Sequence, residues 1–176
     1  MPSGAVSDIE LLPRCADFTL LHSRSAEQRV LEELETNTGT SLFMTLRMLR
    51  LQRAVLAVGM FSLFEALLQT HLGWDAPFKQ LNEYLIGRNH CRLAETFSDY
   101  LAAVNVLKHG RGRSYDQLSA KRSVLEFKLM ADGARFFQEG EMSEVNVLID
   151  ADDKFVRRCA SLIEEISFII PLYGGI

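Results

Sequence analysis

Residues 105–114, with the sequence NVLKHGRGRS, concentrate side chains that could do chemistry. They include Asn105, His109 and three cations, Lys108, Arg111 and Arg113. Residues 105–122 carry five Lys or Arg and one acidic residue, although the whole chain has a formal net charge of −4. Histidine can exchange a proton near neutral pH, since its unperturbed pKa is ~6.5, and arginine binds phosphate through paired N–H donors. These residue types predict an acid/base centre, a phosphate site, or both.

Asn105 and His109 stand at the end of a helical pattern that runs from about residue 88 to 109. They are four residues apart, so a helix places them on one face. Small residues on the same face would permit close approach of another helix, in this chain or in a partner chain. We therefore expect the pair beside a helix–helix seam and not in open solvent. The small residues are Ala94, Ser98 and Ala102.

The basic loop that follows has two interpretations. Its cations could simply complement the helix dipole, with Gly110 just past the helix end, each charge contributing about 0.3–1 kcal/mol. Alternatively, Gly110 and Gly112 let the backbone approach a phosphate that Arg111 and Arg113 hold. In that case the next helix, with Ser114 predicted as its N-cap, offers its N-terminus to the anion.

The longest helical pattern spans about residues 42–72, has apolar residues at three- and four-residue steps, and stops at Gly73. Glu65 lies on its apolar part, on the same face as Arg47 and Gln69. A buried carboxylate needs a cation or a hydrogen-bond donor. We expect Glu65 either to form a structural ion pair or to orient Asn105 or His109.

The remaining patterns predict a mainly α fold, an up-down helical bundle of about four or five helices. Shorter helices are expected over about 25–36 and 76–86, with a final helix capped by Asp150 or Asp152. A small β-hairpin is expected within 123–149. Residues 1–25 have no clear period and are predicted to form an N-terminal arm, followed by a single helical domain over 26–176.

Composition limits the class of protein. The chain has 176 residues, of which 48% are hydrophobic and 24% charged, as in a soluble globular domain. Its three cysteines form no CxxC pair and fit a reducing compartment. No signal peptide is visible, and the most apolar run, 54–64, is shorter than the ~18 residues of a membrane span. We expect a cytoplasmic protein with no membrane, metal or cofactor.

The layout of residues 42–170 resembles the HEPN superfamily of helical RNA-associated domains. The likeness lies in NVLKHG followed by a Gly/Arg/Ser loop, in the preceding long helix with SLFEALL, and in the extended segment before the last helix. It implies a dimer with a metal-independent ribonuclease site, where His is the acid/base and an Arg, with four to six residues between it and the His, clamps phosphate. The Arg positions that match His109 hold Ala102, Ala103 and Val104. Asn105 can occupy the motif's polar position.

Two functions follow as hypotheses. The first is an RNA-binding or RNA-cleaving module, of a toxin or defence system, in which His109 and Asn105 carry catalysis. Lys108, Arg111, Arg113 and Ser114 would bind phosphate, and the chain would form a homodimer along the 42–72 and 88–109 helices. The second is a catalytically silent helical module for dimerisation or for binding another protein. The missing arginine favours the second.

Overall fold

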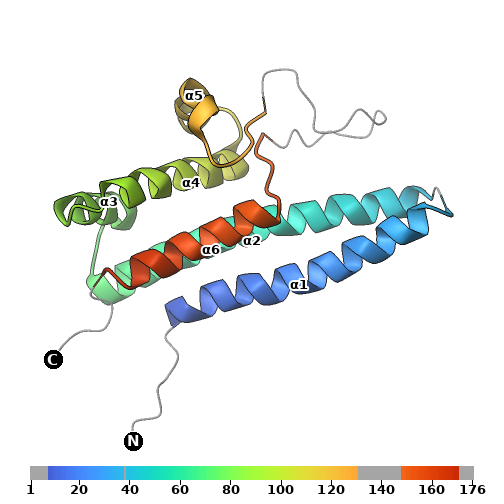
Figure 1. The fold of residues 1–176 in the computed structure, drawn as a ribbon. Helices are drawn as coiled ribbons and strands as arrows, with labels where there is room; N and C mark the ends of the chain where they lie inside the picture. The colour runs from blue at the N-terminus through green and yellow to red at the C-terminus, as the bar shows by residue number, and fades with distance from the viewer. Residues whose placement is uncertain (1–7, 38, 131–147, 171–176) are drawn as a thin grey trace, which may run out of the picture. The chain divides into compact units, whose positions relative to one another are not determined.

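A computed structural model describes residues 8–37, 39–130 and 148–170. The chain divides into two compact units, one made of Met1–Pro77 with Ala151–Ile176 and the other of Phe78–Asp150. The described part is mainly helical (Figure 1). The helices are α1 (Asp8–Leu34), α2 (Thr40–Leu72), α3 (Pro77–Gly87), α4 (Cys91–His109), α5 (Arg113–Ala120), the 3-10 turn η1 (Arg122–Val124) and α6 (Asp153–Ser167).

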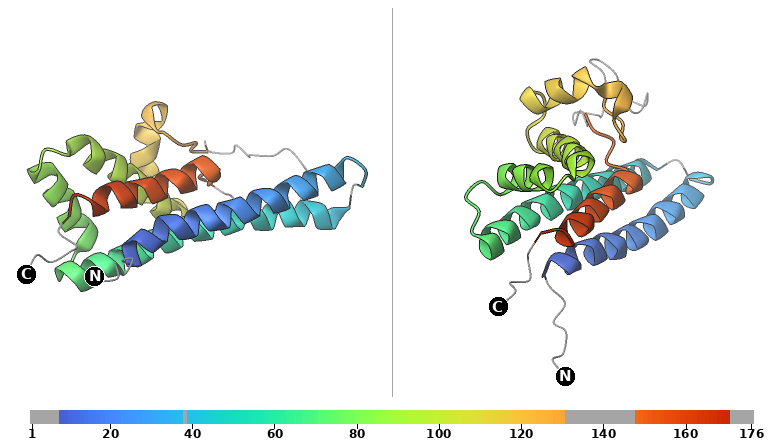
Figure 2. Two further views of the ribbon diagram at one scale, coloured as in Figure 1. Left: turned by 60° about the horizontal axis from the view of Figure 1, so that its bottom comes forward. Right: turned by 60° about the vertical axis from the view of Figure 1, so that its left-hand side comes forward.

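Three helices form the first unit. α1 and α2 run antiparallel as a long hairpin, and α6 lies alongside both of them (Figures 1 and 2). The helices contribute fully buried apolar side chains such as Leu20, Ala57 and Ile163. Cys159 of α6 is also fully buried, as expected of a cysteine that fills a core, and this burial raises the pKa of its thiol far above the ordinary value.

The first helix begins at Asp8, so the prediction of an irregular arm is wrong for residues 8–25. Pro13 lies inside this helix, where it removes one backbone hydrogen bond. Apolar burial outweighs that cost, because Ile9, Leu12, Ala16 and Leu20 recur at three- and four-residue steps and are all buried. The three- and four-residue spacing of these apolar residues is visible in the sequence, but Pro13 argued against a helix there.

α2 agrees closely with its predicted range and ends where Gly73 adopts φ 64°, with its N–H donating to the Gln69 carbonyl. By length and composition alone it could cross a membrane, because its most apolar 18-residue window has a mean hydropathy of 1.5. Only 33% of that window is buried. The rest of this apolar window is therefore half-buried or exposed in this chain.

The second unit is built on α4. The Phe78 ring meets the Phe97 ring edge to face at 5.4 Å, and Ser98 Oγ lies 3.4 Å from Asn82 Oδ1, so α3 packs on α4. Ala94 and Ala102 are buried. Two of the three small residues of α4 are thus buried within the single chain, and the third, Ser98, is half-buried.

The hairpin expected over 123–149 is not supported where the structure describes those residues. Residues 122–124 form a 3-10 turn, and Leu129 and Ile149 form an isolated antiparallel bridge. Two backbone hydrogen bonds accompany the bridge, from Met130 N–H to the Leu148 carbonyl and from Asp150 N–H to the Lys128 carbonyl. The rest of the predicted hairpin, 131–147, lies outside the described residues.

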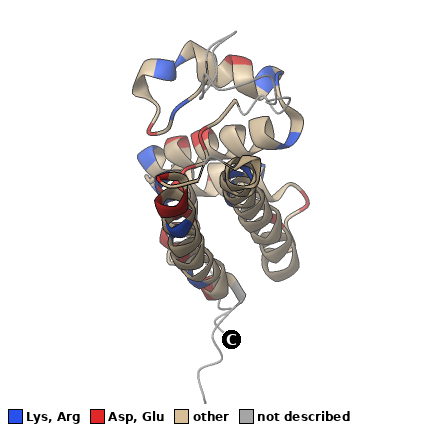
Figure 3. Cartoon of the chain, turned by 90° about the vertical axis from the view of Figure 1, so that its right-hand side faces the viewer, with Lys and Arg blue, Asp and Glu red and all other residues tan. Residues whose placement is uncertain are grey.

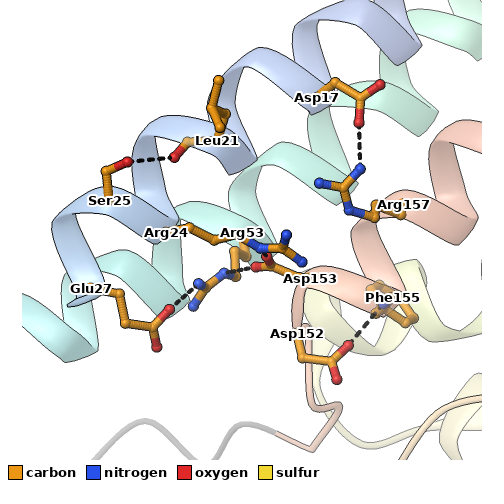
Figure 4. A network of polar contacts seen from close by, with 10 residues as sticks. All are labelled: Asp17, Leu21, Arg24, Ser25, Glu27, Arg53, Asp152, Asp153, Phe155 and Arg157. Atoms are coloured by element: carbon orange, nitrogen blue, oxygen red, sulfur yellow. Dashed lines mark hydrogen bonds and ion pairs between the residues drawn. The ribbon is translucent and has the colours of Figure 1, made fainter. Parts of the chain in front are cut away.

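The final helix begins after Asp152, one of the two caps that the sequence predicted. Asp152 is its N-cap, and the carboxylate accepts a hydrogen bond from Phe155 N–H at 2.8 Å. The next residue, Asp153, turns toward α1 and α2 and joins the polar centre of the first unit (Figure 4).

Arg53 is the hub of that polar centre. It lies on α2, is only 6% exposed, and contacts a carboxylate from each neighbouring helix, Glu27 of α1 and Asp153 of α6. Arg53 Nε is 2.7 Å from Asp153 Oδ1, and Arg24 of α1 pairs with the same aspartate (Figure 4). All three helices of the unit therefore meet at one guanidinium.

Burial by itself would lower the pKa of Arg53. The hydrogen bond to Glu27, the charge of Glu27 and the charge of Asp153 outweigh burial, and the pKa is raised above its ordinary value. The guanidinium thus stays charged, and its two acidic partners are needed to hold that charge away from water.

We predict that Arg53→Ala lowers the free energy of unfolding by about 3 kcal/mol, because it leaves Glu27 and Asp153 facing each other in a partly buried site. Urea denaturation followed by circular dichroism measures this loss. The matched control is Arg157→Ala, which removes an exposed ion pair to Asp17 (Figure 4) and should cost less than about 1 kcal/mol. Equal small losses in the two variants would contradict a structural role for Arg53.

Candidate functional site

The α4–α5 connection is a sharp turn made by two glycines. Gly110 follows α4 with φ 74° and ψ −141°, and its N–H donates to the Val106 carbonyl at 2.8 Å. Gly112 precedes α5 with φ 157°. Both conformations favour glycine over residues with a side chain. The turn therefore brings the end of α4 and the start of α5 together within three residues.

This turn borders an open hollow of about 310 Å³. The hollow is near the lower end of the size range of small-ligand sites. The sequence predicted that six residues form the site. Five of them line the hollow, and Lys108 does not. The lining residues are Asn105, His109, Gly110, Arg111, Gly112, Arg113 and Ser114.

His109 is exposed and Asn105 is half-buried. No helix of the described chain therefore shields His109, and a seam with a partner chain stays a prediction. It is the last residue of α4, and the chain turns away immediately after it. The imidazole is consequently accessible to a molecule that enters the hollow, with the Asn105 amide one helical turn behind it.

Arg111 is positioned by an aromatic ring. Its guanidinium carbon lies 5.7 Å from the centroid of Tyr115, a cation–π arrangement. Tyr115 is buried, and its hydroxyl donates to the Met130 carbonyl at 2.8 Å. An arginine followed four residues later by a tyrosine was a signal for this contact in the sequence, but the prediction of the site did not use it.

Not all the cations counted in the basic stretch belong to the hollow. Lys121 pairs with Asp99 of α4, and Arg122 donates to the Met130 carbonyl at 3.1 Å. These two residues hold α5 and η1 in place. The positive charge at the hollow comes from Arg111 and Arg113, both exposed.

Ser114 is not the N-cap of α5. The helix begins at Arg113 and its N-cap is Gly112, which has no side chain to accept a hydrogen bond from the first turn. The first N–H groups of a helix have no partner within the helix. The first N–H groups of α5 are therefore further hydrogen-bond donors at the hollow. The hollow is also lined by two arginines, an imidazole and an amide.

Glu65 is not among the residues that line the hollow, and the expectation that it orients Asn105 or His109 stays a prediction. It lies on α2 in the other unit, and its side chain is exposed, so the expectation that it is buried is wrong. Within the described ranges, no three His, Cys, Asp or Glu side chains are grouped so that they could hold a metal ion.

Comparison with protein-family models, curated proteins and solved structures finds no significant match to this chain. The HEPN resemblance stays a prediction. The hollow must therefore be interpreted from its own residues.

We predict that Gly110→Ala lowers the free energy of unfolding by about 1–3 kcal/mol, because residues with a side chain rarely adopt φ 74° and ψ −141°. An added Cβ would meet no atom within 4 Å, so the cost comes from the backbone conformation alone. Gly87→Ala is the matched control, because that position is equally open and has no positive φ. Urea unfolding of the two variants tests this, and a Gly110→Ala protein as stable as Gly87→Ala would contradict it.

Proposed function

We propose that this protein is a HEPN-like RNA-binding module whose α4–α5 turn holds the phosphate backbone, and that His109 supports cleavage without a metal. The observation that carries the proposal is the hollow, where one imidazole, one amide, two arginines and an uncapped helix start converge. We place the module in the cytoplasm, in a toxin or defence system.

The chemistry of the donors favours phosphate as the ligand. Arginine binds phosphate oxygens through parallel N–H donors, and helix N-termini attract anions through free N–H groups and the helix dipole. The open, exposed rim suits a polymer that passes across the surface, because a small metabolite is usually enclosed by apolar walls. Lys108, exposed at the end of α4, can contact a neighbouring phosphate of the same strand.

The imidazole supplies a route for cleavage. His109 takes the proton of a ribose 2′-hydroxyl as the 2′-oxygen attacks the adjacent phosphorus, the P–O5′ bond breaks, and the imidazolium returns the proton to the 5′-oxygen. Arg111 and Arg113 stabilise the charge that develops on the phosphoryl oxygens. Asn105 hydrogen-bonds the substrate or the imidazole and fixes its orientation. The products are a 2′,3′-cyclic phosphate and a 5′-hydroxyl.

The second candidate is a catalytically silent module for dimerisation or protein binding. Residues 102–104 are two alanines and a valine, so α4 has no cation at the positions that the active pattern requires. The apolar helix α2, much of it half-buried or exposed, also favours a protein partner.

We predict that Arg111→Ala/Arg113→Ala weakens binding of single-stranded RNA at least tenfold at moderate salt. The slope of log affinity against log salt should fall by about 1.4, because about 0.7 of a counterion is released per phosphate contact. Fluorescence anisotropy of a labelled oligonucleotide across a salt series measures both quantities.

The matched control is Arg88→Ala/Arg92→Ala, which removes the same charge from exposed positions of the same unit outside the hollow. It should leave the affinity and the slope nearly unchanged. Equal losses in the two double variants would mean that overall charge drives binding, and no loss in Arg111→Ala/Arg113→Ala would refute the phosphate site.

We predict that His109→Ala abolishes RNA cleavage in the presence of a chelator but changes RNA affinity less than threefold. An imidazole that transfers protons contributes typically 10²–10⁴-fold to the rate and little to binding. Gel analysis of a 5′-labelled RNA, with the cyclic phosphate identified by its sensitivity to acid, measures this. If the wild type binds RNA but does not cut it, the proposed RNA binding stands and the proposed nuclease activity is refuted.

A further inference from the structure

The exposed face of α2 carries a continuous apolar stripe. Met44, Met48, Leu51 and Val55 are 46%, 60%, 59% and 62% exposed. They recur at steps of four, three and four residues, so they share one narrow face of the helix. The buried residues of α2 lie on the opposite face, among them Leu49, Arg53, Ala57, Met60, Phe64 and Leu68.

The stripe continues toward the C-terminal end of α2 with small residues. Gly59, Ser62 and Ala66 follow Val55 at steps of four, three and four residues. Ser62 and Ala66 are exposed, and a Cβ added at Gly59 would meet no atom within 4 Å. One half of the stripe therefore offers large side chains, and the other half offers the space for them.

We propose that this stripe is a homodimer interface in which α2 packs antiparallel against α2 of a second copy, with the two-fold axis at Val55. Met44 and Ala66 lie eleven residues on either side of Val55, Met48 and Ser62 seven, and Leu51 and Gly59 four. An antiparallel pair centred there sets Met44, Met48 and Leu51 each against a small residue and Val55 against Val55 of the second copy, which allows close helix packing. A parallel pair would set large against large.

The charges beside the stripe fit the same register. Arg47 and Glu65 are 18 residues apart, five full helical turns, so they lie on the same flank of α2. A two-fold axis across antiparallel helices brings equal flanks together. Arg47 precedes Val55 by eight residues and Glu65 follows it by ten, so Arg47 comes within about 3 Å along the axis of Glu65 of the partner subunit. The two rim ion pairs would fix the register more than the affinity.

A second copy suits this face better than lipid does. α1 and α6, which pack on α2, carry charged residues along their length. Figure 3 colours the Lys, Arg, Asp and Glu positions of the described chain. Immersing α2 in a bilayer would carry those charges into hydrocarbon at about 2.5–3.5 kcal/mol each near the centre. The stripe from Met44 to Ala66 is about 33 Å long at 1.5 Å per residue, and it covers one face alone.

The inference gives a geometry to the homodimer that the sequence predicted along the 42–72 helix, and it holds whether or not the α4–α5 turn binds RNA. Sedimentation velocity of the full chain should show a dimer. Val55→Arg sets two like charges at the two-fold axis, and Gly59→Leu fills the space opposite Leu51. Each should raise the dissociation constant more than about tenfold.

Two comparisons separate loss of the interface from loss of the fold. Gly59→Leu replaces a helix-breaking residue with a good helix former in open space, so the monomer should melt no lower than the wild type. Leu31→Arg changes an apolar residue of α1 that is 51% exposed and lies off the stripe, and it should leave the dimer intact. Glu65→Arg should weaken the dimer, and Arg47→Glu/Glu65→Arg should restore it.

Cross-linking tests the direction of packing. In a background with the exposed cysteines replaced, Cys15→Ser/Cys91→Ser, oxidised Val55→Cys should form a disulfide-linked dimer and Met44→Cys should not. In the antiparallel pair the two Met44 positions are about 33 Å apart. Four results would overturn the proposal: a wild-type monomer at about 100 µM, a dimer that survives both Val55→Arg and Gly59→Leu, equal cross-linking at positions 44 and 55, or a stripe that binds phosphatidylcholine vesicles instead of a second copy.

Discussion

The first unit depends on one buried charge. Arg53 cannot be held away from water without partners, and its partners come from both neighbouring helices. The contact with Glu27 fixes the position of α1 along the axis of α2. The contact with Asp153 fixes the position at which α6 begins beside these two helices. The Asp152 cap works with this arrangement, because it starts α6 at the point where the next residue can meet Arg53. A core made only of leucine and phenylalanine would define these positions less sharply.

The cations of the second unit have two roles: some stabilise its fold and others lie at the surface of the hollow. Lys121 and Arg122 hold α5 and η1 in place through Asp99 and the Met130 carbonyl, whereas Arg111 and Arg113 remain at the hollow. Tyr115 connects the two roles, because its buried hydroxyl shares the Met130 carbonyl with Arg122 while its ring lies against Arg111. The site is therefore built on contacts that also fold the unit.

Much of the architecture could be predicted from local patterns. The ranges of α2 and α3, the stops at Gly73 and Gly110 and the cap at Asp152 follow from residue types that have few alternatives at helix ends. The predicted first helix was shorter than α1 because Pro13 argues against a helix. The cost of this proline is outweighed by the burial of apolar residues of α1, which depends on tertiary contacts. The residues of the hollow were predicted together because they are neighbours along the chain.

The sequence by itself determined which segments are helical and which short stretch concentrates an imidazole, an amide and cations, because periodicity and helix-end chemistry are local. Only the tertiary structure decided which charges are buried and which faces remain open. Arg53 became the hub, Glu65 remained exposed and two small residues of α4 were buried, because burial depends on which helix packs against which face. That choice is made by contacts between residues far apart along the chain, which no local pattern records.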